Sequence, residues 1–337
     1  MDQREISDGK HETVPEGDPV ARPAPFRLSV IVPMFNEAEA VDAFLDRILP
    51  LLSTWTDDFE VICIDDGSRD ATAARVLARR RAEPRVKLIC FARNFGKEAA
   101  LSAGIDHATG DAVVTIDADL QHPPELMGEM IARWREGVDV VAAMRSDRSH
   151  DSAARGFVSG AFYRVFNKIA ERPIPPEAGD FRLMDRAVIH ALRRLPERNR
   201  FMKGLFAWVG FRAEMIPYEH TDRVAGESKF RFWSLWNFAL DGITAFSTLP
   251  LRVWSYLGFS VAFIAMVYAS FIVLRTIIFG ADVPGYASIL TAVLFIGGIQ
   301  LVSLGILGEY IGRILIETKQ RPLYLVRAAW GLEDHED

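Results

Sequence analysis

The chain has 337 residues, half of them hydrophobic and a quarter charged, with a formal net charge of −6. The negative charge argues against a nucleic-acid-binding protein, because such proteins carry a basic face. The two cysteines, Cys63 and Cys90, both lie inside apolar runs. They are expected to be buried strand residues of a protein in a reducing compartment, which disfavours a disulfide or a metal role.

The N-terminal segment 1–26 is polar, rich in proline and without apolar periodicity. This composition predicts a disordered tail. The segment has neither the basic start nor the apolar run of a signal peptide, so the N-terminus is expected to stay cytoplasmic.

From residue 27 onward, short β-rich runs alternate with amphipathic helical stretches. Strands that are apolar on both faces and separated by helices predict a mostly parallel sheet covered on both sides. An α/β domain is therefore expected over 27–229. The predicted strands are 28–32, 59–64, 86–91, 112–116 and 138–143, and the predicted helices are 38–52, 71–82, 97–108 and 124–136.

Polar residues follow each predicted strand. In sheets of this class, ligands bind outside the carboxyl ends of the strands. Five polar clusters in succession at that edge therefore predict a single binding site. The clusters contain Pro33, Asn36 and Glu37, then Asp65 and Asp66, then Arg93 and Lys97, then Asp117, Asp119 and Gln121, and finally Arg145.

Asp117 and Asp119 lie two residues apart at the end of an apolar strand. If the extended backbone continues, both carboxylates point to the same side. Two carboxylates, with Gln121 as a third oxygen ligand, suit Mg²⁺ or Mn²⁺ bound jointly with substrate phosphates. The alternative is that the two aspartates only cap the next helix.

Asp65 and Asp66 precede a Gly-Ser pair, so one carboxylate can accept hydrogen bonds from a base or ribose; turn formation alone is the alternative. Arg93 and Lys97 suit neutralisation of a diphosphate, with solvated surface charges as the alternative. The sequence has neither a G-x-G-x-x-G loop after the first strand nor a G-x-x-x-x-G-K-[ST] loop, which argues against NAD binding and ATP hydrolysis.

Two polar clusters follow the alternating region. The first contains Asp180 and Arg182, and the second contains Arg223, Ser228 and Lys229 around a glycine. Cations and a hydroxyl at a flexible glycine suit a phosphate group. Because the second cluster lies directly before a membrane-proximal segment, a basic loop that touches anionic lipid is the alternative.

Two uncharged segments, 256–274 and 286–308, are long enough to span the hydrocarbon core of a bilayer. They predict a transmembrane hairpin over 252–312, with two buried core helices as the alternative. The aromatic-rich segment 230–251 predicts an interfacial amphipathic helix. Basic residues lie outside the pair and not in its connecting loop, so both ends, including a tail over 313–337, are expected to be cytoplasmic.

Six segments together resemble a known family. They are SVIVPMFNE (29–37), IDDGS (64–68), ARNFGKE (92–98), DADLQ (117–121), DFRLM (180–184) and the basic cluster at 223–229. The chain resembles the family 2 glycosyltransferases with a GT-A fold. More narrowly, it is similar to the polyisoprenyl-phosphate glycosyltransferases, the group of the bactoprenol glucosyltransferases and dolichyl-phosphate mannosyltransferases. The resemblance extends to about residue 326 and includes both apolar segments.

The resemblance implies roles for matching residues. Catalysis would involve Asp180, Asp119 and Arg182. The metal, Mg²⁺ or Mn²⁺, would be held by Asp117, Asp119 and Gln121. Acceptor and phosphate binding would involve Arg145, Arg223, Ser228 and Lys229, and Arg182 would also grip a phosphate group. The nucleotide sugar would be bound by Pro33, Asn36, Glu37, Asp65, Asp66, Arg93, Lys97, Asp117 and Ala118.

The implied activity is inverting transfer of one sugar, glucose from UDP-glucose, to undecaprenyl or another polyisoprenyl phosphate at the cytoplasmic face of the plasma membrane. A phosphate monoester is already nucleophilic at neutral pH, so Asp180 is expected to orient substrate more than to remove a proton. The chain lacks the Q-x-x-R-W motif of processive synthases, which favours a single transfer.

Other interpretations stay open. The sugar is alternatively mannose, aminoarabinose or an N-acetylhexosamine, and the acceptor is alternatively a hydroxyl group. A non-catalytic nucleotide-sugar-binding membrane module is the rival from another class. A homo-oligomer, with a tetramer as one option, is expected, and Gly308-x-x-x-Gly312 is a weak signal for such a contact.

Overall fold

The computed structural model describes residues 22, 24–145, 178–198, 200–218, 249–279 and 285–332. Most of the expected N-terminal tail and of the expected interfacial helix lies outside the described residues, as do Arg223, Ser228 and Lys229.

The last residues of the expected N-terminal tail belong to the folded domain. Phe26 is 4% exposed and packs in the core. Arg22 forms ion pairs of 2.8 Å with both Asp139 and Asp185. The folded domain therefore begins earlier than the expected boundary at residue 27.

The described chain contains every strand and helix predicted for residues 27–145, within a few residues of the expected bounds, and further elements that were not predicted. The strands are β1 (Leu28–Met34), β2 (Phe59–Asp65), β3 (Val86–Phe91), β4 (Ala112–Thr115), β5 (Val140–Arg145), β6 (Ala178–Asp185), β7 (Ala213–Tyr218) and β8 (Val326–Trp330). The helices are α1 (Ala38–Trp55), α2 (Thr72–Ala82), α3 (Lys97–His107), α4 (Leu126–Arg135), α6 (Arg186–Arg193), α7 (Met202–Trp208), α9 (Leu249–Phe279) and α10 (Tyr286–Thr318).

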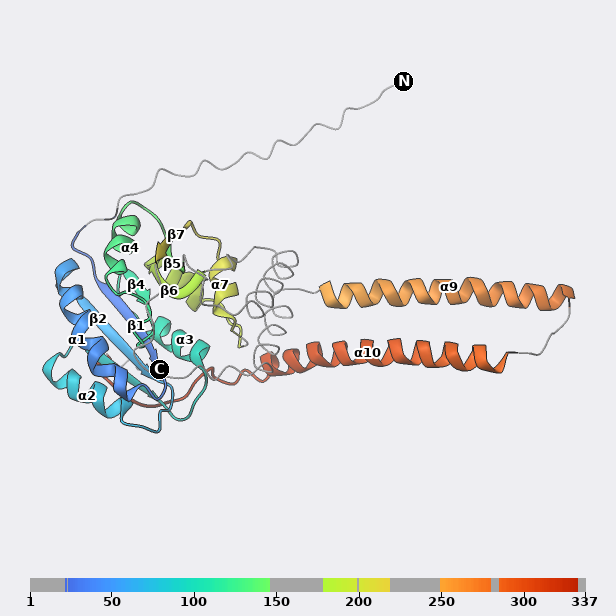
Figure 1. The fold of residues 1–337 in the computed structure, drawn as a ribbon, viewed down its shortest axis with the longest axis horizontal. Coiled ribbons are helices and arrows are strands. Elements are labelled where there is room, and N and C mark those ends of the chain that lie inside the picture. The colour runs from blue at the N-terminus through green and yellow to red at the C-terminus, as the bar shows by residue number, and fades with distance from the viewer. Residues whose placement is uncertain are drawn as a thin grey trace, which may run out of the picture.

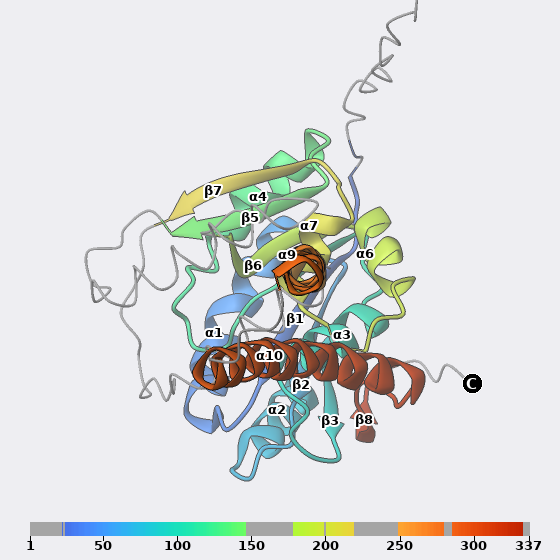
Figure 2. The ribbon, with the colours of Figure 1, turned by 90° about the vertical axis from the view of Figure 1, so that its right-hand side faces the viewer.

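The strands form one eight-stranded sheet in the order β7-β5-β6-β4-β1-β2-β3-β8, which Figure 2 shows from β7 at one end to β8 at the other. β4, β1, β2 and β3 are parallel neighbours, and β5 is parallel to β7. β6 is antiparallel to both β4 and β5, and β8 is antiparallel to β3. The prediction of a mostly parallel α/β sheet is confirmed.

The central strands send alternate residues into two hydrophobic cores. Val30 and Val32 of β1 belong to the core shared with α1, α2 and α4, whereas Ile31 between them belongs to the core shared with α3, α6 and α7. Figure 1 shows the two helix layers on opposite sides of the sheet. Cys63 and Cys90 are free and buried within this arrangement, as predicted.

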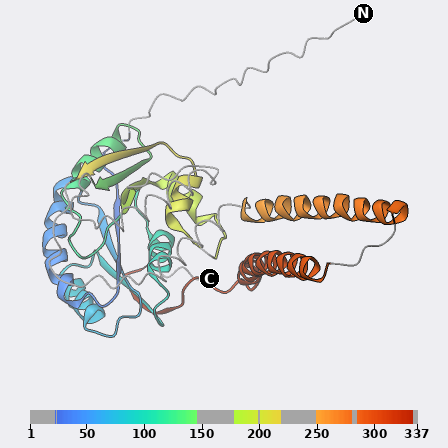
Figure 3. The ribbon, with the colours of Figure 1, turned by 45° about the vertical axis from the view of Figure 1, so that its right-hand side comes forward.

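Two long helices, α9 and α10, lie side by side and project from one side of the sheet domain (Figures 1 and 3). Within the described residues, Phe295–Thr318 is the one segment long and apolar enough to cross a membrane, and none of it is buried. This exposure contradicts the alternative of a buried core helix. α9 contains a shorter apolar stretch, Tyr256–Tyr268, so the second span stays a prediction.

The chain returns to the sheet after α10. The helix continues beyond its expected end at residue 312, and β8 pairs with β3 inside the segment that was expected to be a tail. The Ala92 N–H also donates to the Leu325 carbonyl at 2.9 Å. The C-terminal segment therefore completes one edge of the sheet.

Candidate active site

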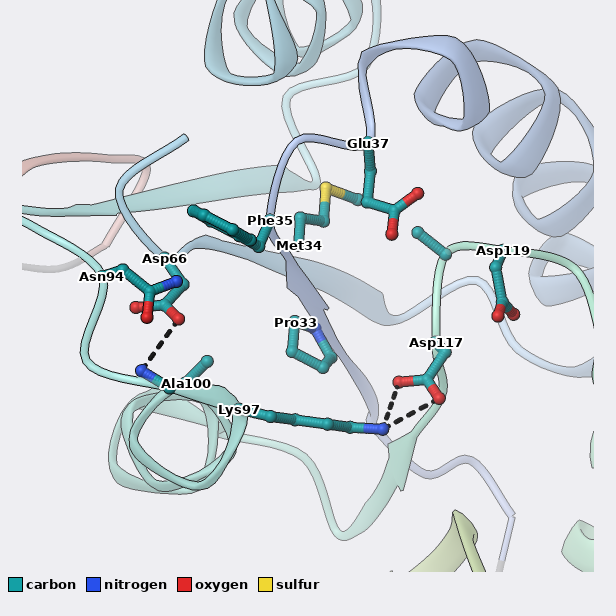
Figure 4. A pocket seen from close by; sticks show the side chains of 12 residues that line it. Pro33, Met34, Phe35, Glu37, Asp66, Asn94, Lys97, Ala100, Asp117 and Asp119 are labelled. Carbon is teal, nitrogen blue, oxygen red and sulfur yellow. Dashed lines mark hydrogen bonds and ion pairs between the residues drawn. The ribbon is translucent and has the colours of Figure 1, made fainter. Parts of the chain in front are cut away.

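A pocket of ≈ 370 Å³ lies at the carboxyl ends of β1 and β4, beside the start of α3 (Figure 4). This is the edge of the sheet at which the sequence predicts a ligand site. The predicted site residues that line the pocket are Pro33, Glu37, Asp66, Lys97, Asp117, Ala118 and Asp119. Asn36, Asp65, Arg93 and Gln121 are not among its lining residues.

Asp117 and Asp119 lie on the loop that follows β4. The Gln121 N–H donates to Asp119 Oδ1 at 3.1 Å. Leu120 between them has a φ of 58°, which is unfavourable for a bulky residue and marks a constrained turn. α4 begins only at Leu126, so the alternative that these aspartates cap the next helix is wrong.

The oxygen donors of this loop fit a divalent cation that is shared with substrate. Asp117 and Asp119 supply carboxylates, and the part of the chain that the structure describes contains no group of three His, Cys, Asp or Glu side chains able to hold a metal. Mg²⁺ is usually held by one or two carboxylates plus substrate phosphates, and Mn²⁺ favours similar oxygen ligands. The pair therefore fits a metal whose coordination a diphosphate completes.

Lys97, the first residue of α3, extends through the pocket to Asp117 (Figure 4). Its Nζ lies 2.7 and 2.9 Å from the two carboxylate oxygens of Asp117 and 2.8 Å from Asp180 Oδ2. Burial opposes the positive charge, but the two carboxylates raise the pKa of Lys97 above its ordinary value. Lys97 was predicted from the sequence to neutralise a diphosphate. In the structure it is paired with carboxylates.

Asp180 reaches the site because β6 runs antiparallel to β4. The first residues of β6 therefore lie beside the end of β4, with Arg182 opposite Thr115, and the Thr115 hydroxyl donates to the Asp180 carbonyl. Burial opposes ionisation, but Lys97 and further cations hold the pKa of Asp180 well below its usual range. Asp180 is thus an ion-paired carboxylate and a weak base.

Asp66 fixes the loop that leads into α3. Its two carboxylate oxygens accept hydrogen bonds from the Phe95 N–H at 2.6 Å and the Gly96 N–H at 2.9 Å. Gly96 has a φ of 97°, a conformation that glycine adopts at low cost. Burial raises the pKa of Asp66 in spite of these hydrogen bonds. Asp66, predicted to bind the nucleotide, therefore also positions Lys97.

Three other predicted nucleotide residues make local contacts. Asp65 Oδ1 accepts a hydrogen bond from the Ser68 N–H at 3.1 Å, and the Asn36 N–H donates to the Ser68 hydroxyl at 2.9 Å. The Arg93 guanidinium lies 3.9 Å from the centre of the Phe95 ring. The turn chemistry offered as an alternative for Asp65 is present, and its nucleotide role stays a prediction.

Arg182 does not face the pocket as a phosphate ligand would. Its side chain is buried, its guanidinium lies 3.8 Å from the centre of the Phe206 ring, and it donates to the Gly179 carbonyl at 2.6 Å. Burial lowers the pKa of Arg182 to about 10, still far above neutral pH. The expectation that Arg182 grips phosphate directly is therefore corrected: it is a buried cation that supports Asp180.

The predicted acceptor side is described only in part. Arg145 is the last residue of β5, at the same edge of the sheet as the pocket. Arg223, Ser228 and Lys229 lie outside the described residues. Their role in acceptor binding stays a prediction.

Five lining residues were not predicted from the sequence, namely Met34, Phe35, Asn94, Gly96 and Ala100. Four of them lie between predicted site residues: Asn94 and Gly96 between Arg93 and Lys97, and Met34 and Phe35 between Pro33 and Asn36. β1 ends at Met34, and Phe35 after it has 44% of its surface exposed. An aromatic residue flanked by site residues at a strand end is the signal that would have found Phe35. Ala100 lies one turn after Lys97 on α3 and carries no such signal.

Comparisons with known proteins show the family of the chain. The glycosyl transferase family 2 profile matches residues 29–193, and a GtrB C-terminal hairpin profile matches residues 249–314. A bactoprenol glucosyl transferase of Shigella phage SfX is 48% identical over 302 residues, which cover 90% of this chain and 99% of that protein. The chain belongs to glycosyltransferase family 2.

Other relatives of this family 2 glycosyltransferase match a similar share of the chain. An uncharacterized glycosyltransferase of Synechocystis sp. is 50% identical over 91% of this chain and 96% of that protein. A prophage bactoprenol glucosyl transferase homolog of Escherichia coli is 47% identical over 89% of this chain and 98% of that protein. A solved mannosyltransferase from Pyrobaculum calidifontis, in complex with GDP-Man and Mn²⁺, covers 91% of this chain and 86% of its own, with 21% identity and a TM-score of 0.43. So loose an overlap transfers no residue roles.

Proposed function

We propose that this family 2 glycosyltransferase moves one glucose from UDP-glucose to undecaprenyl phosphate or another polyisoprenyl phosphate, with inversion at the anomeric carbon. The observation that carries the proposal is the 48% identity to a bactoprenol glucosyl transferase over 90% of the chain. That similarity extends over nine-tenths of the chain, and the GtrB C-terminal hairpin profile matches residues 249–314.

The state of Asp180 supports a phosphate acceptor. A hydroxyl acceptor needs a base to remove its proton, whereas a phosphate monoester is largely dianionic at neutral pH. Asp180 lies 2.8 Å from the Lys97 ammonium, and this ion pair makes its carboxylate a poor proton acceptor. In the proposed reaction Asp180 orients the substrates and holds Lys97, while the acceptor supplies its own nucleophilic oxygen.

The remaining roles follow from the lining of the pocket. Asp117 and Asp119, with Gln121, would hold Mg²⁺ or Mn²⁺, which stabilises the negative charge of the departing nucleoside diphosphate. Asp66 keeps the loop before α3 in place, and Lys97 brings a positive charge to the same region. With a metal bound at the aspartates, its charge and that of Lys97 would lie where two anionic substrates must meet.

The C-terminal helices support a site at the membrane surface. The GtrB C-terminal hairpin profile covers both α9 and α10, which favours two spans. The Arg198 N–H donates to the two carboxylate oxygens of Glu317, near the end of α10, at 2.9 and 3.1 Å. This contact and β8 attach the catalytic domain to one end of α10, where the positive-inside bias predicts the cytoplasm. A homo-oligomer stays a prediction.

The proposal is tested by incubating the detergent-solubilised chain with Mn²⁺ or Mg²⁺, undecaprenyl phosphate and a panel of labelled nucleotide sugars. We expect label from UDP-glucose in the organic phase, and we expect it to be lost with a chelator and in Asp119→Ala. Label from a different donor would keep the reaction class and replace the sugar. Donor binding by folded protein without transfer from any donor would contradict the proposal and favour a non-catalytic binding module.

A further inference from the structure

Lys97 joins two carboxylates from different strands of the sheet. Its Nζ lies within 2.9 Å of both oxygens of Asp117, on the loop after β4, and 2.8 Å from Asp180 on β6. The Lys97 side chain is 41% exposed and lines the pocket, so it borders the space that a ligand would fill. Asp117 is also one of the two aspartates that fit a divalent metal, so the ammonium and the metal compete for the same oxygens.

The backbone around Lys97 is held in place by contacts on two elements. Asp66 binds the N–H groups of Phe95 and Gly96, the two residues before Lys97. Gly104, two turns further along α3, packs so closely on β1 that a Cβ there would lie 2.2 Å from Ile31. α3 is therefore fixed at its start and along its length, and only the flexible stem of Lys97 can move.

The ammonium of Lys97 offsets the negative charges of Asp117 and Asp180. Asp117 and Asp180 would otherwise place two negative charges close together, which is unfavourable in a partly desolvated site. A metal held only by Asp117 and Asp119 lacks a third protein carboxylate, since the described residues offer no group of three acidic, histidine or cysteine ligands. Free metal must therefore displace Lys97 while gaining few ligands in return.

We propose that Lys97 is the resident counter-cation of the metal site: it occupies Asp117 in the empty enzyme and yields it when the metal arrives with the nucleotide diphosphate. This inference rests on the proposed function and adds a binding order to it. After the exchange, Lys97 keeps its contact with Asp180 and directs its remaining N–H groups toward the diphosphate. The enzyme then binds metal weakly on its own and strongly together with the nucleotide.

The experiment measures the Mn²⁺ affinity of the full chain in detergent, from the paramagnetic resonance signal of free Mn²⁺, with and without UDP. Lys97→Met keeps the length of the side chain and removes its charge. We expect Lys97→Met to bind Mn²⁺ without UDP about tenfold more tightly than the wild-type chain, an effect in the usual range for coupled sites. With UDP present, the advantage of the variant is expected to disappear.

Two matched variants separate displacement from a general loss of positive charge. Lys97→Arg retains a cation and is expected to keep the weak binding of the wild-type chain. Lys203 is a second cation whose charge acts on Asp180, and Lys203→Met is expected to leave the Mn²⁺ affinity nearly unchanged. If Lys97→Met does not fold, as judged by circular dichroism and gel filtration, Lys97→Gln replaces it.

An unchanged Mn²⁺ affinity in folded Lys97→Met or Lys97→Gln would overturn the inference, and so would an equal gain in Lys203→Met. Asp119→Ala distinguishes this failure from a failure of the proposed function. If Asp119→Ala loses Mn²⁺ binding in the presence of UDP, the metal site stands and only the role of Lys97 is overturned. If Asp119→Ala binds Mn²⁺ as the wild-type chain does, the metal site fails and the inference fails with it.

Discussion

Two lysine–carboxylate clusters lie at opposite edges of the same sheet. At the amino edge, Glu60 pairs with Lys87 at 2.6 Å and accepts hydrogen bonds from Ser29 and from the N–H and hydroxyl of Thr109, and its side chain is 1% exposed. At the carboxyl edge, Lys97 is 41% exposed and shared between two carboxylates in a pocket.

The two clusters differ in whether their carboxylates can bind a ligand. The Glu60 carboxylate is matched by donors within the protein, so the cluster has a structural role and no surplus charge to offer a ligand. At the carboxyl edge, one ammonium serves both Asp117 and Asp180, with Asp119 on the same loop. Carboxylate oxygens that line an open pocket are what a divalent cation and its phosphate ligands can use.

The largest expected effect is on the carboxyl edge. Asp119→Ala is predicted to lower kcat by on the order of 10³-fold, because several kcal/mol of charge stabilisation on the leaving diphosphate is lost. The measurement is label transfer at saturating donor, with circular dichroism to confirm the fold. Transfer within a few fold of the wild-type rate would show that the carboxylates of this loop are not used in catalysis.

At the amino edge, Glu60→Ala is predicted to lower stability and to leave transfer nearly unchanged. It leaves Lys87 without its buried partner, so the free energy of unfolding falls by roughly 3 kcal/mol, as for other broken buried pairs. Transfer by the folded protein is expected to stay near the wild-type rate. Denaturant unfolding and activity at low temperature check this, and a stable but inactive variant would contradict the structural role.

A smaller effect is expected at Asp180. Asp180→Asn keeps the shape of the side chain and is predicted to lower kcat by about tenfold, below the ~10²–10⁴-fold loss typical of a missing general base. The reason is that the variant loses orientation and the pairing of Lys97, but no proton transfer. A loss of 10³-fold or more, together with a lost acidic limb of the pH–rate profile, would assign Asp180 the role of base.

The smallest effect concerns Glu98, next to Lys97 on α3. Burial and the nearby Asp180 raise the pKa of Glu98 to about 7 from its ordinary value of 4.5. The stability that its protonated form contributes is complete below the ordinary value and is lost as the pH rises through about 7. Glu98→Gln is therefore expected to raise the Tm by a few degrees at pH 8 and to change it little at pH 5. Equal Tm differences at both pH values would contradict the raised pKa.

The parallel part of the fold could be predicted because each of its strands is apolar on both faces and is followed by an amphipathic helix. β6, β7 and β8 could not, since their short runs lack that alternation, and the antiparallel pairing of β6 with β4 depends on contacts distant in sequence. β8 is a strand only because the chain returns from α10 to the free edge of β3.

The site could be predicted to the level of its loops but not of its contacts. Asp117, Asp119 and Lys97 could be assigned to one site because strand ends converge in a parallel sheet. The sequence does not show that Lys97 reaches Asp117, that Asp66 binds two backbone N–H groups, or that Arg182 points into the core, because each depends on the close packing of α3 and α7 against the sheet. Residue type alone therefore assigned all three to phosphate or nucleotide.

Two acceptors that differ only in the phosphate group test most directly whether the enzyme transfers glucose to a phosphate. Purified chain is given labelled UDP-glucose and Mn²⁺ with either undecaprenyl phosphate or undecaprenol, and lipid-linked label is measured over time. We predict transfer to undecaprenyl phosphate and none above background to undecaprenol, because Asp180 is an ion-paired carboxylate that does not activate a hydroxyl. Comparable transfer to undecaprenol would contradict it.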